Sequence, residues 1–217
     1  MISFSHVTKE YETEDGRTSV YRDFSEEIAD GEFVIITGES GSGKTTLLKM
    51  LLKETEPESG QIFVDGKNIA EIKRRDVPYY RRSIGVIFQD FRLIQNESVY
   101  DNLVSAILAT GGSHREAEQK IVNVLTMLGI DSLHKRYPRE MSGGEQQKVC
   151  LARAIINNPK ILLVDEPTGN LDPASSAEIM RLLDVVNAQG ITVLMATHDI
   201  AAADKAGRRR IDLDRLK

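Results

Sequence analysis

A glycine-rich segment, Gly38 to Thr45 (GESGSGKT), has residue types and spacing suited to holding a chain of phosphates. It fits the pattern G-x-x-x-x-G-K-[ST] and lies between an apolar run and a helix-forming run. The glycines let the main chain wrap closely around an anion, so that successive N–H groups and a helix N-terminus face it. We expect Lys44 to reach the β- and γ-phosphates and the hydroxyl of Thr45 to bind Mg²⁺. The segment predicts a nucleotide site.

Two carboxylates follow a second apolar run. Asp165 and Glu166 come directly after Ile161 to Val164, and the carboxyl ends of such strands are where nucleotides bind in doubly wound folds. Asp165 is suited to the Mg²⁺ shell. Glu166 is then available to orient or deprotonate an attacking water, because phosphoryl transfer depends mainly on positioning and charge stabilisation. Together with the glycine-rich segment, the pair predicts nucleotide hydrolysis.

A third segment, Met141 to Gln147 (MSGGEQQ), is able to begin a helix. Ser142 is a favourable N-cap, and two glycines open the first turn. A helix cap is the simpler interpretation of these residues, but their exposed N–H groups also form a second anion site. If Ser142 of one subunit faces the glycine-rich segment of another, a symmetric dimer encloses two nucleotides.

The elements that must position these residues alternate between strands and helices. We expect strands near residues 2–7, 32–37, 61–64, 84–88, 161–164 and 192–196, and helices near 43–52, 99–109, 115–128, 143–157 and 173–189. This order predicts an α/β fold with a mostly parallel sheet covered on both faces. We interpret the chain, 1–217, as one domain, in which a helical subdomain (90–158) is inserted into a catalytic core (1–89 and 159–217).

Composition limits the classes of function. Hydrophobic residues make up 41% and charged residues 28% of the 217 residues, as in ordinary folded proteins. The formal net charge of −5 provides no overall positive field to bind nucleic acid. Apolar runs fall far short of the ~20 residues of a membrane helix. Because Cys150 is the one cysteine and no signal-peptide pattern opens the chain, we expect a cytoplasmic protein that reaches a membrane through a partner.

Taken together, these motifs resemble those of the ATP-binding cassette (ABC) ATPases along essentially the whole chain. The resemblance implies a P-loop NTPase fold, Mg²⁺-dependent ATP hydrolysis and a homodimer that closes on ATP. It implies catalytic roles for Glu166, His198 and Gln89, and magnesium binding by Thr45, Gln89 and Asp165. The residues that it implies in nucleotide binding are Tyr11, Gly38, Ser40, Gly41, Ser42, Gly43, Lys44, Thr45 and Thr46, and the signature residues Ser142, Gly143, Gly144 and Glu145.

Three smaller features belong to the same resemblance. Tyr11 matches the aromatic residue that stacks on adenine, and 170–172 (NLD) match the D-loop. The signature begins with Met141 where leucine is usual, which is a nearly volume-conserving exchange. Its fifth residue is Glu145 where glutamine is common, and neither departure implies lost activity.

Within the family, the segment Ile84 to Leu93 (IGVIFQDFRL) is similar to the ATPases of bacterial cell division. That similarity implies an FtsX-like integral membrane protein as partner, a place on the cytoplasmic side of the cell membrane, and regulation of peptidoglycan hydrolysis. We expect a helix of the partner to dock in a groove lined by Phe91, Leu93, Val99 and Tyr100.

Alternatives of other classes remain open. The ATPase of a lipoprotein-release or macrolide-type exporter shares every catalytic residue, and only its membrane partner distinguishes it. An ABC protein acting on DNA or ribosomes is disfavoured, because the chain has no room for a long coiled-coil insertion or a second cassette and its net charge has the wrong sign. A nucleotide-gated scaffold is disfavoured, though not excluded, by the intact pair Asp165 and Glu166 and by His198.

Overall fold

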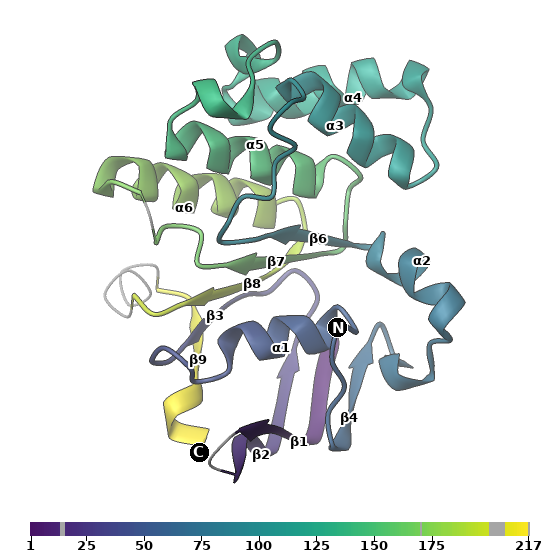
Figure 1. Cartoon of the computed structure of the whole chain (residues 1–217), viewed down its shortest axis with the longest axis vertical. Coiled ribbons are helices and arrows are strands. Elements are labelled where there is room, and N and C mark those ends of the chain that lie inside the picture. The colour runs from purple at the N-terminus through teal and green to yellow at the C-terminus, as the bar shows by residue number, and fades with distance from the viewer. Residues whose placement is uncertain (14–15, 170, 200–206, 217) are drawn as a thin grey trace.

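In the part of the chain that the structure describes, five parallel strands form the central sheet (Figure 1). The computed structural model describes residues 1–13, 16–169, 171–199 and 207–216, so Asn170 of the predicted D-loop lies outside the described residues. The helices and strands are, in chain order, β1 (Ile2–Thr13), β2 (Gly16–Ile28), β3 (Phe33–Thr37), α1 (Lys44–Leu51), β4 (Ser59–Val64), β5 (Lys67–Asn68), α2 (Val77–Arg81), β6 (Ile84–Ile87), α3 (Val99–Ala109), α4 (His114–Leu128), α5 (Gly143–Ile155), β7 (Ile161–Asp165), α6 (Pro173–Asn187), β8 (Thr192–Thr197) and β9 (Arg209–Asp212).

The central sheet has the order β6-β7-β8-β3-β9, and each neighbouring pair is parallel. A second sheet, β2-β1-β4-β5, is antiparallel. Strands β3 and β8 are buried along their whole length. Strands of a parallel sheet that is covered on both faces have continuous apolar sequences, which is why the sequence pattern identifies them. The predicted α/β fold with a mostly parallel sheet is confirmed.

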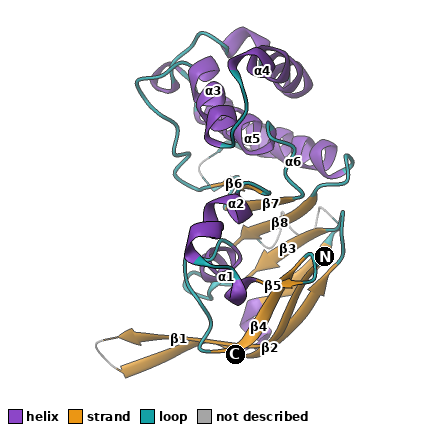
Figure 2. Cartoon of the chain, turned by 90° about the vertical axis from the view of Figure 1, so that its right-hand side faces the viewer, coloured by secondary structure: helices purple, strands orange, loops and turns teal. Residues whose placement is uncertain are grey.

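Helices α5 and α6 lie against one face of the central sheet, with α3 and α4 stacked on the outer side of α5, and α1 with the second sheet covers the other face (Figures 1 and 2). Along β3, Ile35 belongs to the apolar cluster beneath α3 to α6, whereas Val34 and Ile36 belong to the cluster on the opposite face. Leu103 of α3 lies in the same cluster as Ile35, so the helices between β6 and β7 share their core with the sheet. The division into a catalytic core and an inserted subdomain of residues 90–158 stays a prediction.

Strand β2 is an element that the sequence pattern does not predict. Its buried Tyr21, Phe24 and Ile28 are spaced by three and four residues, as they would be on a helix. The pairing of β1 with β2 shifts register at several points between Phe4 and Glu10, and a bulge adds a residue to one strand at such a point. These irregularities remove the alternation with period two by which a half-buried strand is recognised.

A buried asparagine holds the irregular connection between β6 and α3. Asn102 is 1% exposed. Its Oδ1 accepts the main-chain N–H of Ile94 at 2.8 Å, and its Nδ2 lies 3.0–3.2 Å from the carbonyl oxygens of Ile94, Glu97 and Ser98. The side chain of Ser98 caps α3 by accepting the N–H of Asp101. A single amide thus pairs main-chain groups on both sides of a segment without regular structure.

We expect Asn102→Ala to lower the free energy of unfolding by about 2–3 kcal/mol, because it leaves buried main-chain groups without partners. Urea denaturation followed by circular dichroism measures the change. The matched control is Asn123→Ala, at an exposed position of α4, which we expect to change stability by no more than about 0.5 kcal/mol. Equal losses in the two variants would contradict this role for Asn102.

Candidate functional site

The glycine-rich segment forms a tight loop between β3 and α1. Gly38, Gly41 and Gly43 have φ angles of 156°, 81° and 104°, in the region that glycine adopts without strain. A Cβ on Gly43 would lie 2.3 Å from Cγ1 of Val20 and 2.7 Å from the hydroxyl oxygen of Tyr21. Because β2 presses against the loop here, Gly43 is required both for its conformation and for space.

The loop is held in shape by side chains of the same chain. Lys44 is buried, and its Nζ donates to the carbonyl oxygens of Gly38 at 2.7 Å and Glu39 at 2.9 Å. From β2, Tyr21 donates its hydroxyl to the carbonyl oxygen of Gly43. Burial raises the pKa of Tyr21, so this phenol remains a donor at neutral pH. The phosphate-binding loop is therefore preformed.

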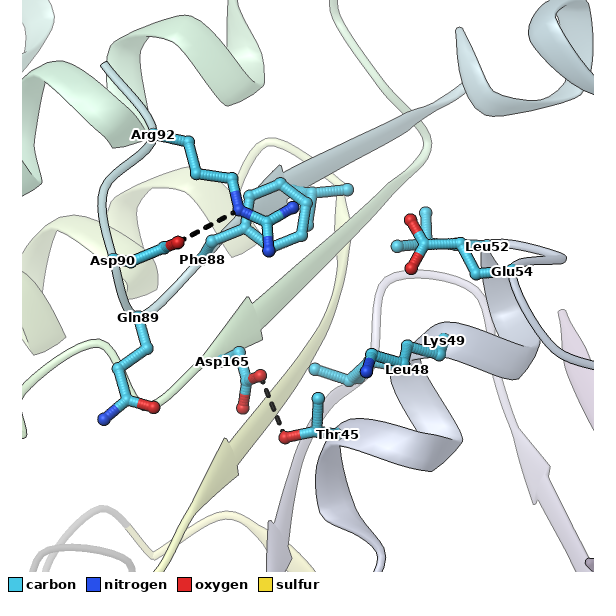
Figure 3. Close-up of a pocket in the computed structure, with 11 residues that line it drawn as sticks. Thr45, Leu48, Lys49, Leu52, Glu54, Phe88, Gln89, Asp90, Arg92 and Asp165 are labelled. Carbon is cyan, nitrogen blue, oxygen red and sulfur yellow. Dashed lines mark hydrogen bonds and ion pairs between the residues drawn. The ribbon is translucent and has the colours of Figure 1, made fainter. Parts of the chain in front are cut away.

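Thr45 and Asp165 meet at the carboxyl end of β7. Oγ1 of Thr45 donates to Oδ2 of Asp165 at 3.1 Å (Figure 3). Burial raises the pKa of Asp165, and the charge of Glu166 acts in the same direction, whereas the hydrogen bond from Thr45 opposes the shift. The other oxygen of Asp165, Oδ1, is buried and has no hydrogen-bond partner among the described residues. Oδ1 is therefore a hydrogen-bond acceptor that neither the described protein groups nor bulk solvent satisfies.

These donors suit a hard cation of the magnesium type. Mg²⁺ is bound through one or two carboxylates together with hydroxyl, water and phosphate oxygens, not by a cage of protein ligands. In the described part of the chain, no group of three or more His, Cys, Asp or Glu side chains could hold a metal ion. The unpartnered Oδ1 of Asp165 beside Thr45 is an oxygen site of the kind that such an ion uses.

Glu166 and His198 lie side by side, because β7 and β8 are parallel neighbours with Asp165 paired to Ala196. Nδ1 of His198 is 2.9 Å from Oε1 of Glu166, and Oε2 of Glu166 is buried without a partner among the described residues. The main chain of Glu166 has a φ of 47°, and its N–H donates to Ala196 at 2.9 Å. Strained backbone of this kind is concentrated at functional sites.

A cavity of about 550 Å³ brings the predicted nucleotide and catalytic residues together. It is lined by Tyr11, Val20, Ser40, Gly41, Gly43, Lys44, Thr45, Thr46, Gln89, Glu166 and His198. Gly38 and Ser42 do not line this cavity. Ser42 is 1% exposed, and its side chain is packed against Gly38, where an added Cβ would lie 2.4 Å from the Oγ of Ser42. Asp165 lines an adjoining cavity of about 450 Å³, which shares Thr45 and Gln89 with the first (Figure 3).

The opening of the larger cavity carries an exposed aromatic ring. Tyr11 is 39% exposed, its hydroxyl is 3.5 Å from Oγ1 of Thr46, and Nζ of Lys9 lies 5.0 Å from its ring centre. Sequence reasoning missed Val20, which lines the cavity, and Tyr21 beneath it. Neither could be found, because both belong to β2, whose pattern does not indicate a strand.

The signature residues, Ser142 to Glu145, lie outside both cavities, at the N-terminus of α5. Ser142 caps α5 by accepting the N–H of Glu145 at 3.2 Å, and Glu145 accepts the N–H of Ser142 at 2.8 Å. The bond from the Ser142 N–H holds the pKa of Glu145 below its usual value. A Cβ on Gly144 would lie 2.9 Å from Oγ of Ser175 in α6, so α5 packs closely on α6. None of the residues Ser142 to Glu145 lines the two cavities.

The fold and the phosphate-binding loop define a P-loop nucleoside triphosphatase. The chain belongs to the ABC transporter family, whose model matches residues 21–169. The cell division ATP-binding protein FtsE of Streptococcus pneumoniae is 42% identical over 214 residues, which are 99% of this chain and 92% of that protein. FtsE of Mycobacterium tuberculosis is 43% identical over 213 residues, 98% of this chain and 92% of that protein.

A solved structure agrees with this assignment. A dimeric ATP-binding cassette in a post-hydrolysis state, bound to ADP and Pi, superimposes with a TM-score of 0.86 at 34% identity, covering 98% of this chain and 94% of that one. The predicted class of enzyme, an ATPase of the ABC family, is therefore confirmed. The roles of the individual residues stay predictions.

Gly43→Ala and Gly41→Ala distinguish the two reasons for glycine in this loop, which are its positive φ and the lack of space for a side chain. Both variants place a Cβ on a residue with positive φ, which costs about 1–2 kcal/mol. At Gly43 the added Cβ would also collide with Val20 and Tyr21, whereas at Gly41 no other atom lies within 4 Å of it. We expect the Kd for ATP to rise about 10-fold in Gly41→Ala and about 100-fold in Gly43→Ala. Titration with a fluorescent ATP analogue measures both, and equal Kd values would contradict the packing argument.

Proposed function

We propose that this chain is the ATPase subunit of a cell-division complex on the cytoplasmic side of the bacterial membrane. ATP-driven closure of its homodimer acts on an FtsX-like integral membrane protein and so regulates peptidoglycan hydrolysis. The supporting observation is the match to proteins named cell division ATP-binding protein FtsE, which extends over 98–99% of the chain at 38–43% identity. None of the helices in the described residues has the length and apolar character of a membrane span.

The dimer is proposed because each site is incomplete in one chain. Ser142 and Glu145 do not line the cavity that contains Lys44 and Glu166. In a symmetric dimer, Ser142 to Glu145 of the second copy would cover the phosphates held by the first. The related cassette of known structure is a dimer bound to ADP and Pi.

The residues of the cavity have distinct roles in the proposed reaction. Lys44 and the N–H groups of the loop would bind the phosphates, while Thr45, Asp165 and Gln89 would hold a magnesium ion. When bound, the ion neutralises charge on the phosphate oxygens. Glu166 accepts the proton of the attacking water, or orients that water, through its unpartnered Oε2. His198 fixes the carboxylate through Oε1, and because it lines the same cavity we propose that its ring contacts the terminal phosphate.

We expect Glu166→Gln to lower kcat about 10²–10⁴-fold, because an amide cannot accept a proton, while the Kd for ATP changes by no more than about threefold. Phosphate release and nucleotide titration measure the two quantities. With turnover blocked, ATP accumulates a closed dimer, which light scattering detects. Lys44→Ala is the matched comparison: it raises the Kd for ATP at least about tenfold. Undiminished hydrolysis by Glu166→Gln would contradict the role of Glu166.

The partner is proposed to dock in the cavity between α1 and the segment after β6 (Figure 3). Apolar Leu48, Leu52 and Phe88 form its walls, and charged Glu54 and Arg92 lie at its exposed rim. The cavity also contains Gln89, so an inserted helix would touch a residue that lines the nucleotide cavity.

Burial excludes two of the four docking residues that the sequence indicates. Leu93 is 6% exposed and Val99 is fully buried, and both belong to the core beneath the helices. Phe91 packs against the same core, and Tyr100 is exposed but does not line the cavity. Apolar residues in an irregular segment are as often core as surface, and the sequence alone does not separate the two cases.

The test of the proposed function is an affinity purification of Glu166→Gln with MgATP from detergent-solubilised membranes, with the partner identified by mass spectrometry. We expect a stoichiometric four-helix membrane protein with an extracytoplasmic domain. Glu54→Lys in the same background reverses a rim charge and lowers recovery at least about fivefold, whereas Glu118→Lys on exposed α4 does not. Recovery of a lipoprotein-release or efflux permease would instead establish the exporter alternative.

A further inference from the structure

The segment after Gln89 has an unusual main-chain conformation. Phe91 and Arg92 are consecutive, are not glycine, and have φ angles of 58° and 51°. Nε of Arg92 donates to Oδ1 of Asp90 at 3.0 Å, and its guanidinium lies 3.7 Å from the centre of the Phe88 ring. Left-handed conformations at such residues are sparsely populated and persist only where surrounding contacts enforce them.

The enforcing contacts come from one face of α5. Nη2 of Arg153 donates to the carbonyl oxygen of Phe91 at 2.8 Å, and Nη1 donates to the carbonyl oxygen of Arg92. One turn earlier, Sγ of Cys150 is 3.2 Å from the same carbonyl oxygen of Phe91. Burial lowers the pKa of Arg153, but a guanidinium stays charged at neutral pH. The two carbonyl groups that define the strained conformation are thus held by one planar cation.

The same helix carries the signature residues at its other end. Ser142 caps α5, and Arg153 follows eleven residues later, about 16 Å along the axis at the rise of an α-helix. The helix is fixed against α6 by the close approach of Gly144 to Ser175 and by the ion pair of Lys148 with Glu178 at 2.7 Å. Ser142 and Arg153 therefore lie at the two ends of one helix that is anchored along α6.

We infer that Arg153 is a positioning residue, which holds residues 90–92 so that Gln89 stays in the nucleotide cavity of its own chain. It thereby links Gln89 to the helix whose N-terminus meets the nucleotide of the second copy. The inference rests on the proposed roles of Gln89 and Ser142. Arginine is suited to the task because its fixed fork reaches two neighbouring carbonyl groups at once, whereas lysine offers a single point charge.

The test is a double-mutant cycle on the full-length protein, with Arg153→Met, Gln89→Ala and the double variant. We expect Arg153→Met to lower kcat about tenfold while the Kd for ATP changes by no more than about twofold. If Arg153 acts through Gln89, the double variant is no slower than Gln89→Ala, so the two effects are not additive. Arg153→Lys, which keeps the positive charge but replaces the two forked nitrogens with one, is expected to have an intermediate kcat.

Arg115→Met, at an exposed position of α4, is the control and leaves kcat unchanged. Melting temperatures are measured for every variant, and if Arg153→Met does not fold, the cycle is carried out with Arg153→Lys. The inference would be overturned if the losses of kcat in the two single variants were additive in the double variant. It would also be overturned if Gln89→Ala lowered kcat while the Arg153 variants left it unchanged. An unchanged kcat in Gln89→Ala would overturn the role proposed for Gln89, and the inference with it.

Discussion

The register of three parallel strands is the constraint on which the site depends. Thr37 of β3 pairs with Thr197 of β8, and Ala196 of β8 pairs with Asp165 of β7. These pairs bring the phosphate-binding loop, the acidic pair and His198 to one edge of the sheet, although they are far apart in the chain. A slip of one residue would turn every side chain of a strand to the opposite face. Because apolar clusters cover both faces, the packing of the core sets the geometry of the site.

The edge of the sheet also accumulates polar groups that the chain leaves unsatisfied. Buried side-chain atoms without hydrogen-bond partners among the described residues include Thr37 Oγ1, Ser42 Oγ, Asp165 Oδ1 and Glu166 Oε2. Native proteins pair nearly all such atoms, so exceptions usually mark functional places. Here they surround the loop that holds Lys44. Of these four atoms, the two carboxylate oxygens belong to residues that line the cavities, where a bound cation or hydrogen-bond donor would satisfy them and an apolar ligand would not.

Much of the fold could be predicted from the sequence, because its buried strands are continuous apolar runs and α3 begins and ends at Val99 and Ala109 as expected. The phosphate-binding loop could be located as well, since its spacing requires glycine at fixed positions. Other features depend on contacts between distant residues. Bulges concealed β2, and β9 is a four-residue edge strand that begins with two arginines. No sequence pattern indicated the role of Arg153, because the main-chain carbonyl groups that it binds lie about sixty residues earlier in the chain.

The thiol that shares a carbonyl group with Arg153 has a consequence for the chemistry of the protein. Burial raises the pKa of Cys150 to about 12, and the reactive species of cysteine is the thiolate. The single cysteine of the chain therefore resists alkylation and oxidation while α5 and the segment after Gln89 remain together. The rate at which a thiol reagent modifies Cys150 would therefore measure how often the contact between α5 and the segment after Gln89 opens.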